Sequence, residues 1–211
     1  WTEVEYIGAN TEWETKDNEI FHDEVKQIPL QWDLIGRHNY MNALAAIAAA
    51  RHVGITPENS IKALSQFKSV KKRMEKIYTI DKIELYDDFA HHPTAIATTL
   101  AGLRAKVGDS PIIAVIEPRS ATMRLGVHKE ALSAAVADAD QVYWYAKADT
   151  HWNNADVALA CSVPAVASSD IELLLDLTAV AAQKGGHIVI MSNGSFDGFH
   201  GRLLDRLARA S

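Results

Sequence analysis

Two carboxylates and two imidazoles lie between an apolar run and a proline in the middle of the chain. Asp87 and Asp88 end the β-prone run, and His91 and His92 precede Pro93, which can open a helix. Open α/β sheets hold nucleotides at the carboxyl ends of their strands, where a carboxylate can accept from a ribose and an imidazole can approach a phosphate. The segment therefore indicates a nucleotide site. An ordinary strand-to-helix turn with Asp as the helix cap is the alternative that this segment leaves open.

Two carboxamides and an arginine offer further contacts to a nucleotide. Asn39 and Asn42 are three residues apart, so they share one face of a helix start and can read a base edge. Arg73 follows two lysines, and its planar fork can hold a phosphate. The alternatives are that Asn39 is merely a helix cap and that Arg73 is a solvated linker charge.

Polar residues also follow two strongly apolar runs. Glu117, Arg119 and Ser120 come after the run 111–116, and Arg119 can pair bidentately with a substrate carboxylate. Ser192 and Asn193 end the last apolar run and lead into a loop whose glycines let a ligand approach the backbone. A surface salt bridge at Arg119 is the alternative.

Several classes of protein are disfavoured by what the sequence contains. Neither a complete G-x-x-x-x-G-K-[ST] loop nor G-x-G-x-x-G is found, which argues against a stand-alone ATPase and an NAD oxidoreductase. The net charge of −6 predicts no nucleic-acid partner, and we expect no membrane partner because no long apolar span occurs. Adjacent His91 and His92 suit a shared zinc poorly. A single cysteine, Cys161, fits a cytoplasmic location.

The elements that must position these residues are predicted from hydrophobic periodicity and from caps. Residues 1–33 resemble two or three short antiparallel strands, followed by helices over 39–53 and 57–67. Strands and helices then alternate, which predicts a Rossmann-like α/β fold with a mostly parallel sheet and helices on both faces. The predicted domains are 1–70, a small α+β piece, and 71–211. The expected strands are 74–80, 82–86, 111–116, 141–145, 165–167 and 187–191, and the expected helices are 93–107, 126–137, 155–160, 170–184 and 198–210.

Four motifs in order resemble those of one family, the Mur ligases, which are ATP-dependent amide-forming enzymes of bacterial peptidoglycan synthesis. Residues 36–43 are similar to the family's G-x-H-N-x-x-N-A element, 73–75 to its linker arginine motif, and 87–93 to its D-D-[YF]-[AG]-H-x-P loop. Residues 117–126 and 191–194 are most similar to the branch that joins L-alanyl-γ-D-glutamyl-meso-diaminopimelate, the murein tripeptide, to UDP-N-acetylmuramate. That branch works in peptidoglycan recycling.

The resemblance implies that this chain is a C-terminal fragment, an expectation that its start at Trp1 also suggests. Residues 1–70 would end a central ATP-binding domain, and 71–211 would be the C-terminal Rossmann-like domain. The missing N-terminal and central domains would be its partners, with Mg²⁺ ligands mainly in the missing part, so the fragment itself is expected to be inactive. Ser195 and Asp197 stand where the family has glycines.

The resemblance also implies a role for each candidate residue. ATP would be bound by Asn39 and Asn42 at the adenine, by Asp88 at the ribose, and by Arg73 and His91, the implied catalytic residues, at the phosphates. The peptide pocket would be lined by Arg119, Ser120, Ser192 and Asn193. The functional alternatives are another Mur ligase that adds an amino acid to a UDP-muramoyl substrate, and a non-catalytic nucleotide-binding module.

Overall fold

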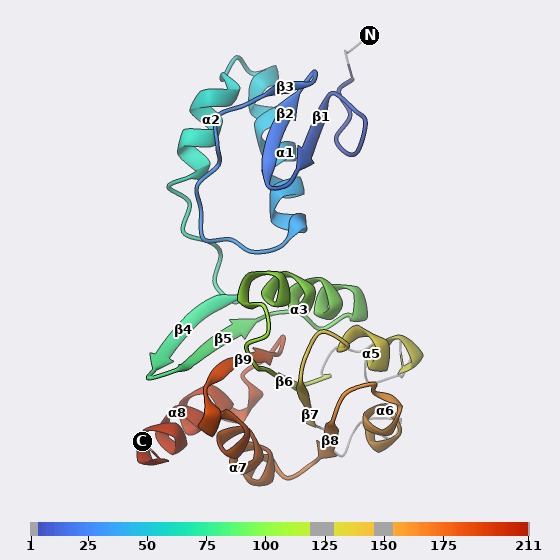
Figure 1. The fold of residues 1–211 in the computed structure, drawn as a ribbon, viewed down its shortest axis with the longest axis vertical. Helices are drawn as coiled ribbons and strands as arrows, with labels where there is room; N and C mark the ends of the chain where they lie inside the picture. The colour runs from blue at the N-terminus through green and yellow to red at the C-terminus, as the bar shows by residue number, and fades with distance from the viewer. Residues whose placement is uncertain (1–3, 119–128, 146–153, 211) are drawn as a thin grey trace. The chain divides into compact units, whose positions relative to one another are not determined.

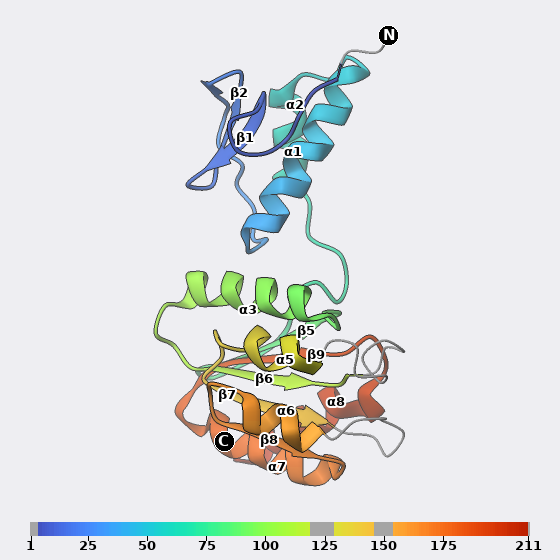
Figure 2. The same ribbon diagram turned by 90° about the vertical axis from the view of Figure 1, so that its right-hand side faces the viewer.

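The computed structural model describes residues 4–118, 129–145 and 154–210, and the chain divides into two compact units. Unit 1 comprises residues 1–69 and unit 2 residues 70–211. Figures 1 and 2 show both units, each of which is described here by itself. Among the described helices, none is long and apolar enough to cross a membrane.

Unit 1 packs a small antiparallel sheet against two helices. The sheet runs in the order β1 (Trp13–Lys16), β2 (Glu19–His22) and β3 (Val25–Lys26), as the alternating pattern predicts. The helices are α1 (Arg37–His52) and α2 (Pro57–Leu64). One face of alanine-rich α1 is buried, and it joins Trp13 and Ile20 of the sheet in a single apolar core.

The caps of these helices follow sequence rules, with one exception. Thr56 caps α2 as predicted, since its hydroxyl accepts a hydrogen bond from the amide of Asn59 at 3.3 Å. Asn39 is not the cap of α1. The cap is Gly36, whose φ of 91° is costly for any residue with a Cβ atom, so the helix begins at Arg37.

Unit 2 is built on a six-stranded sheet in the order β4-β5-β9-β6-β7-β8. Edge strand β4 is antiparallel to β5, and all other neighbouring pairs are parallel. The last strand of the sequence thus lies between two much earlier ones. The strands are β4 (Glu75–Ile80), β5 (Ile83–Asp88), β6 (Ile112–Ile116), β7 (Gln141–Tyr145), β8 (Ala165–Ser168) and β9 (Gly186–Met191).

Helices cover both faces of this sheet, which confirms the predicted fold class. On one face α3 contacts α5 and α5 contacts α6, and on the other face α7 and α8 pack together (Figure 2). Apolar side chains from β5, β6, β7 and β9 pack against α7 and α8 to form the main core. The helices are α3 (Pro93–Val107), α5 (Lys129–Ala135), α6 (Asn154–Ala160), α7 (Ile171–Ala181) and α8 (Phe199–Ala210), with 3₁₀ turns at Ala182–Lys184 and Phe196–Gly198.

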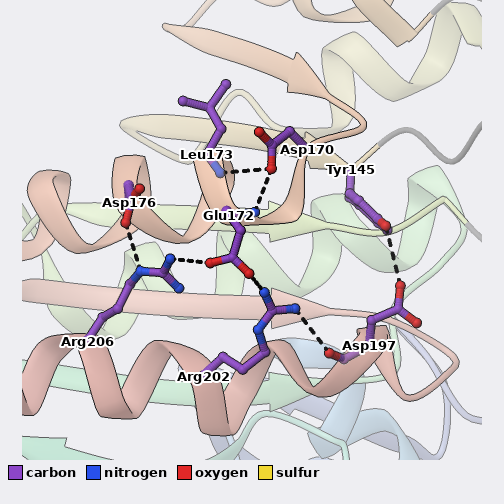
Figure 3. Close-up of polar contacts among 8 residues, drawn as sticks. All are labelled: Tyr145, Asp170, Glu172, Leu173, Asp176, Asp197, Arg202 and Arg206. Carbon is purple, nitrogen blue, oxygen red and sulfur yellow. Dashed lines mark hydrogen bonds and ion pairs between the residues drawn. The ribbon is translucent and has the colours of Figure 1, made fainter.

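Polar contacts join α7 to α8 on the second face (Figure 3). Arg206 bonds Asp176 at 2.7 Å and also pairs with Glu172, which in turn pairs with Arg202. The Tyr145 hydroxyl lies 3.3 Å from a carboxylate oxygen of Asp197, in the turn that leads into α8. The start of α8 is therefore held to both α7 and β7.

Candidate active site

Three of the motif segments meet at one edge of the unit 2 sheet. Strands β5, β9 and β6 are adjacent and parallel, and Met191 is in register with both Asp88 and Ile116. The backbone pairing continues past the strands, because the Ser192 amide donates to the Asp88 carbonyl at 3.0 Å and the Glu117 amide donates to the Met191 carbonyl at 2.9 Å. The carboxyl ends of these strands thus hold the motif residues together, where open α/β sheets bind ligands.

Asp88 is buried and already engaged. Its side-chain oxygens accept from the backbone amides of Met74 and Ala90, each at 2.7 Å, and the residue is only 3% exposed. Burial raises the pKa of this carboxyl above its usual range, against the opposing effects of the two amides and of Arg73. Asp88 therefore fixes the segment around Met74 to the loop after β5. Its contact with a ribose stays a prediction.

Arg73 and His91 lie around one aromatic ring. The Arg73 guanidinium is 5.6 Å from the centre of the Phe89 ring, and the His91 ring meets Phe89 edge-on at 5.1 Å. His91 Nδ1 is 2.9 Å from the Phe89 carbonyl oxygen, which fixes a proton on Nδ1 and leaves Nε2 available to another partner. Phe89 thus brings together two of the groups that were expected to approach phosphates. His92, not an Asp, caps α3.

Ser192 is part of a buried hydrogen-bond network, and its place in a peptide pocket stays a prediction. Its hydroxyl donates to a Glu117 carboxylate oxygen at 2.5 Å and accepts from the Gly194 amide at 2.9 Å. Both Ser192 and Glu117 are at most 2% exposed. The network sets the shape of the loop after β9. Asn193, next in the chain, has a buried side-chain oxygen that finds no hydrogen-bond partner in the described part of the chain and could accept from a donor.

Two residues that the sequence did not single out as ligands also reach this edge. Lys72 Nζ donates to the Gly194 carbonyl at 2.9 Å. His200 Nε2 lies 3.1 Å from Asp87 Oδ1, although the two atoms are not aligned as a hydrogen bond. The repeated lysines before Arg73 and the His near the end of the last loop were the only signals of either contact.

The remaining predicted residues lie elsewhere. Asn39 and Asn42 are in unit 1, on the first turns of α1, where Asn39 donates to the Ile35 carbonyl at 2.7 Å and Asn42 is exposed. Unit 1 also has an open hollow of about 790 Å³, whose lining includes four acidic residues and neither Asn39 nor Asn42. Arg119 and Ser120 lie outside the described residues.

Metal ligands are not clustered in the described part of the chain. Over residues 4–118, 129–145 and 154–210, no three His, Cys, Asp or Glu side chains are grouped so that they could hold an ion.

Comparisons with known proteins agree with the motifs and the fold. The chain is 44% identical to the UDP-N-acetylmuramate–L-alanyl-γ-D-glutamyl-meso-2,6-diaminoheptandioate ligase of Escherichia coli K12, over 99% of this chain and 48% of that protein. It superimposes on 45% of the murein peptide ligase of Psychrobacter arcticus with a TM-score of 0.68, at 34% identity and over 95% of this chain. The Thermotoga maritima UDP-N-acetylmuramate–alanine ligase gives a TM-score of 0.74 at 18% identity, over 97% of this chain and 48% of that one, and supports the fold alone.

The chain thus spans about half the length of the curated relatives that it matches. Residues 72–194, most of unit 2 and all of its motif loops, match the family described as Mur ligase, glutamate ligase domain. On the fold, the motifs and this match, the chain belongs to the Mur ligase family.

Proposed function

We propose that the chain works as part of an ATP-dependent ligase that joins the tripeptide L-alanyl-γ-D-glutamyl-meso-diaminopimelate to UDP-N-acetylmuramate. The observation that carries the proposal is the meeting of the Asp88, Glu117 and Ser192 segments at one sheet edge. The 44% identity to the E. coli enzyme over nearly the whole chain favours this substrate pair.

In the proposed reaction the muramoyl carboxylate takes the γ-phosphoryl group of ATP and becomes an acyl phosphate. The peptide amine, after losing a proton, attacks the acyl carbon, a C–N bond forms, and the C–O bond to phosphate breaks. Such chemistry depends mainly on positioning and on neutralising phosphate charge. Arg73, a permanent cation beside the Phe89 ring, would supply that neutralisation, and His91, beside the same ring, would contact a phosphate.

The chain would divide the remaining work between two loops. The loop after β5 would contact the ribose and the phosphates of the nucleotide. The loop after β9 would receive the peptide, with the unpaired Asn193 oxygen accepting an N–H or ammonium donor. Mg²⁺ would accompany the ATP phosphates, with its protein ligands mainly outside this chain, and by itself the chain would not turn over ATP.

The test measures phosphate release and product formation by the full-length protein with ATP, Mg²⁺ and UDP-N-acetylmuramate, offering tripeptide or L-alanine. We expect turnover that depends on the tripeptide. Turnover with L-alanine alone would support the other proposed branch, because relatives at 31% identity are UDP-N-acetylmuramate–L-alanine ligases. Nucleotide binding without either reaction would favour a non-catalytic module. ATP hydrolysis by the 211-residue chain alone would contradict the division of labour.

A further inference from the structure

The loop after β9, residues 192–198, is held in place from several directions. Ser192 bonds both Glu117 and the Gly194 amide, and Asp197 receives the Tyr145 hydroxyl at 3.3 Å. Within this framework the Asn193 side-chain oxygen is buried and has no hydrogen-bond partner among the described residues. Asn193 lies between Ser192 and Gly194, so the backbone that carries its side chain is held at the residues on both sides.

One side chain from the start of unit 2 reaches into this loop. The Lys72 ammonium donates to the Gly194 carbonyl at 2.9 Å, across 122 residues of sequence. A hydrogen bond from a charged donor is stronger than a neutral one and fixes its acceptor more firmly. The opposite partner is a backbone carbonyl, so the contact depends on the lysine and on the shape of the loop.

The Lys72 backbone is itself fixed on both sides. Its amide donates to the Glu75 carboxylate at 3.0 Å, and its carbonyl accepts from the Phe89 amide at 2.8 Å. Lys72 has a φ of 58°, a left-handed conformation that residues other than glycine adopt at a cost and keep only where the surroundings enforce it. The Lys72 ammonium therefore reaches the Gly194 carbonyl from a backbone that is held in place.

The same backbone segment also carries residues that are expected at the nucleotide. Arg73 follows Lys72 directly, and Met74 is bonded to Asp88 at 2.7 Å. Phe89, which bonds the Lys72 carbonyl, is the ring that Arg73 and His91 flank. A single residue thus connects the group of residues expected at the phosphates with the loop expected at the peptide.

We propose that Lys72 is a positioning residue for the peptide substrate: its ammonium holds the Gly194 carbonyl so that Asn193 is presented to the tripeptide. The proposal rests on the proposed function.

The experiment compares three variants of the full-length ligase. Lys72→Met removes the charge at similar length, and Lys72→Arg keeps a cationic donor. Lys71→Met is the matched control, since Lys71 is the exposed neighbour. Steady-state kinetics are measured with the tripeptide and ATP varied in turn. We expect Lys72→Met to raise the KM for tripeptide about tenfold, Lys72→Arg to recover most of it, and both to leave the KM for ATP within about twofold.

A second measurement uses the 211-residue chain and needs no activity. Amide hydrogen exchange of residues 193–198 should be about tenfold faster in Lys72→Met than in Lys71→Met or the wild type, while β5 and β6 keep their protection. If the wild-type ligase shows no turnover that depends on the tripeptide, the proposed function is wrong. The exchange result then still decides whether Lys72 holds the loop.

Three outcomes would overturn the proposal. One is an unchanged KM for tripeptide in Lys72→Met. Another is a rise in the KM for ATP that equals or exceeds the rise for tripeptide, which would place Lys72 at the phosphates. The third is exchange that speeds up throughout unit 2, which would make the lysine a general stabilising residue.

Discussion

Replacing Asp88 by Asn in the 211-residue chain separates a structural role from a role at the ribose. The two side chains have nearly the same shape, but the carboxylate offers two acceptor oxygens and the carboxamide only one. Asp88 uses both oxygens, for Met74 and for Ala90. In Asp88→Asn, one of these buried amides therefore faces an NH₂ group instead of an acceptor.

The expected cost follows from those two bonds. A hydrogen bond to a charged group contributes about 1.5–3 kcal/mol, and a buried donor left unsatisfied costs about 1–3 kcal/mol. Asn also removes a charge that burial disfavours, which offsets part of the loss. We expect Asp88→Asn to lower the free energy of unfolding by about 1–2 kcal/mol and Asp88→Ala, which loses both acceptors, by about 2–4 kcal/mol.

The assay is urea unfolding followed by far-UV circular dichroism, with native-state hydrogen exchange to assign the change to unit 2. The Met74 and Ala90 amides should lose protection first. Asp81→Asn is the matched control, because Asp81 lies in an exposed turn with a φ of 49°, a conformation that Asn tolerates.

The reasoning is refuted if Asp88→Asn unfolds within about 0.5 kcal/mol of the wild type and its Met74 amide stays protected, since 0.5 kcal/mol is the usual scatter of surface substitutions. The carboxylate would then be available to a ribose. In the full-length ligase that result should accompany a raised KM for ATP in Asp88→Asn.

Three other predictions concern pH, a surface network and the peptide pocket. Burial lowers the pKa of His187, although the carboxylate of Glu84 lies 3.3 Å away. Because the unfolded chain takes up this proton at a higher pH than the folded chain, the free energy of unfolding should be highest above about pH 6.5 and should decrease as pH falls to the lowered pKa of His187. His187→Gln should flatten this pH dependence in urea unfolding, and an unchanged slope would contradict it. Glu172→Ala should lower the free energy of unfolding by less than about 1 kcal/mol despite the two arginine partners of Glu172, since its side chain is 56% exposed. A loss of several kcal/mol in the same assay would contradict this prediction. Arg119→Ala should raise the KM for tripeptide and spare ATP in steady-state kinetics, with only partial recovery in Arg119→Lys; the opposite pattern would move Arg119 to the nucleotide.

Local signals predicted the elements of the fold well. Pro93 opens α3, and α7 begins directly after Asp170, whose carboxylate caps it. The apolar run at 112–116 is a strand with every residue buried. These signals work because caps, proline and burial on both faces of a sheet act within a few residues of sequence. The same locality explains why the alternative of Asn39 as a helix cap was wrong: both Asn39 and Gly36 suit a cap, and only the backbone conformation decides between them.

The contacts of the candidate site depend on tertiary structure and could not be predicted this way. Asp88 was a candidate because of its motif, but its partner Met74 lies 14 residues earlier, directly before the neighbouring strand β4. Ser192 was a candidate from its motif, and its hydrogen bond to Glu117, 75 residues away in the sequence, could not be read from it. Lys72 looked like one of several linker charges until the sheet order brought Gly194 beside it. Residue types therefore indicated where the site is, and the sheet order determined what each side chain does.

The place of β9 has a consequence for how this chain is made. Its pairing partners β5 and β6 are both synthesised well before it, and the register joins Asp88 to a residue about 100 positions later. Gly186 lets β9 fit in, because a Cβ atom there would lie 2.6 Å from the Pro111 carbonyl oxygen. While a ribosome is still translating the segment before Gly186, β5 and β6 lack the strand that joins them, so the sheet closes only after β9 has been made. Nascent chains stalled earlier expose two unpaired strand edges, which are substrates for chaperones and templates for aggregation.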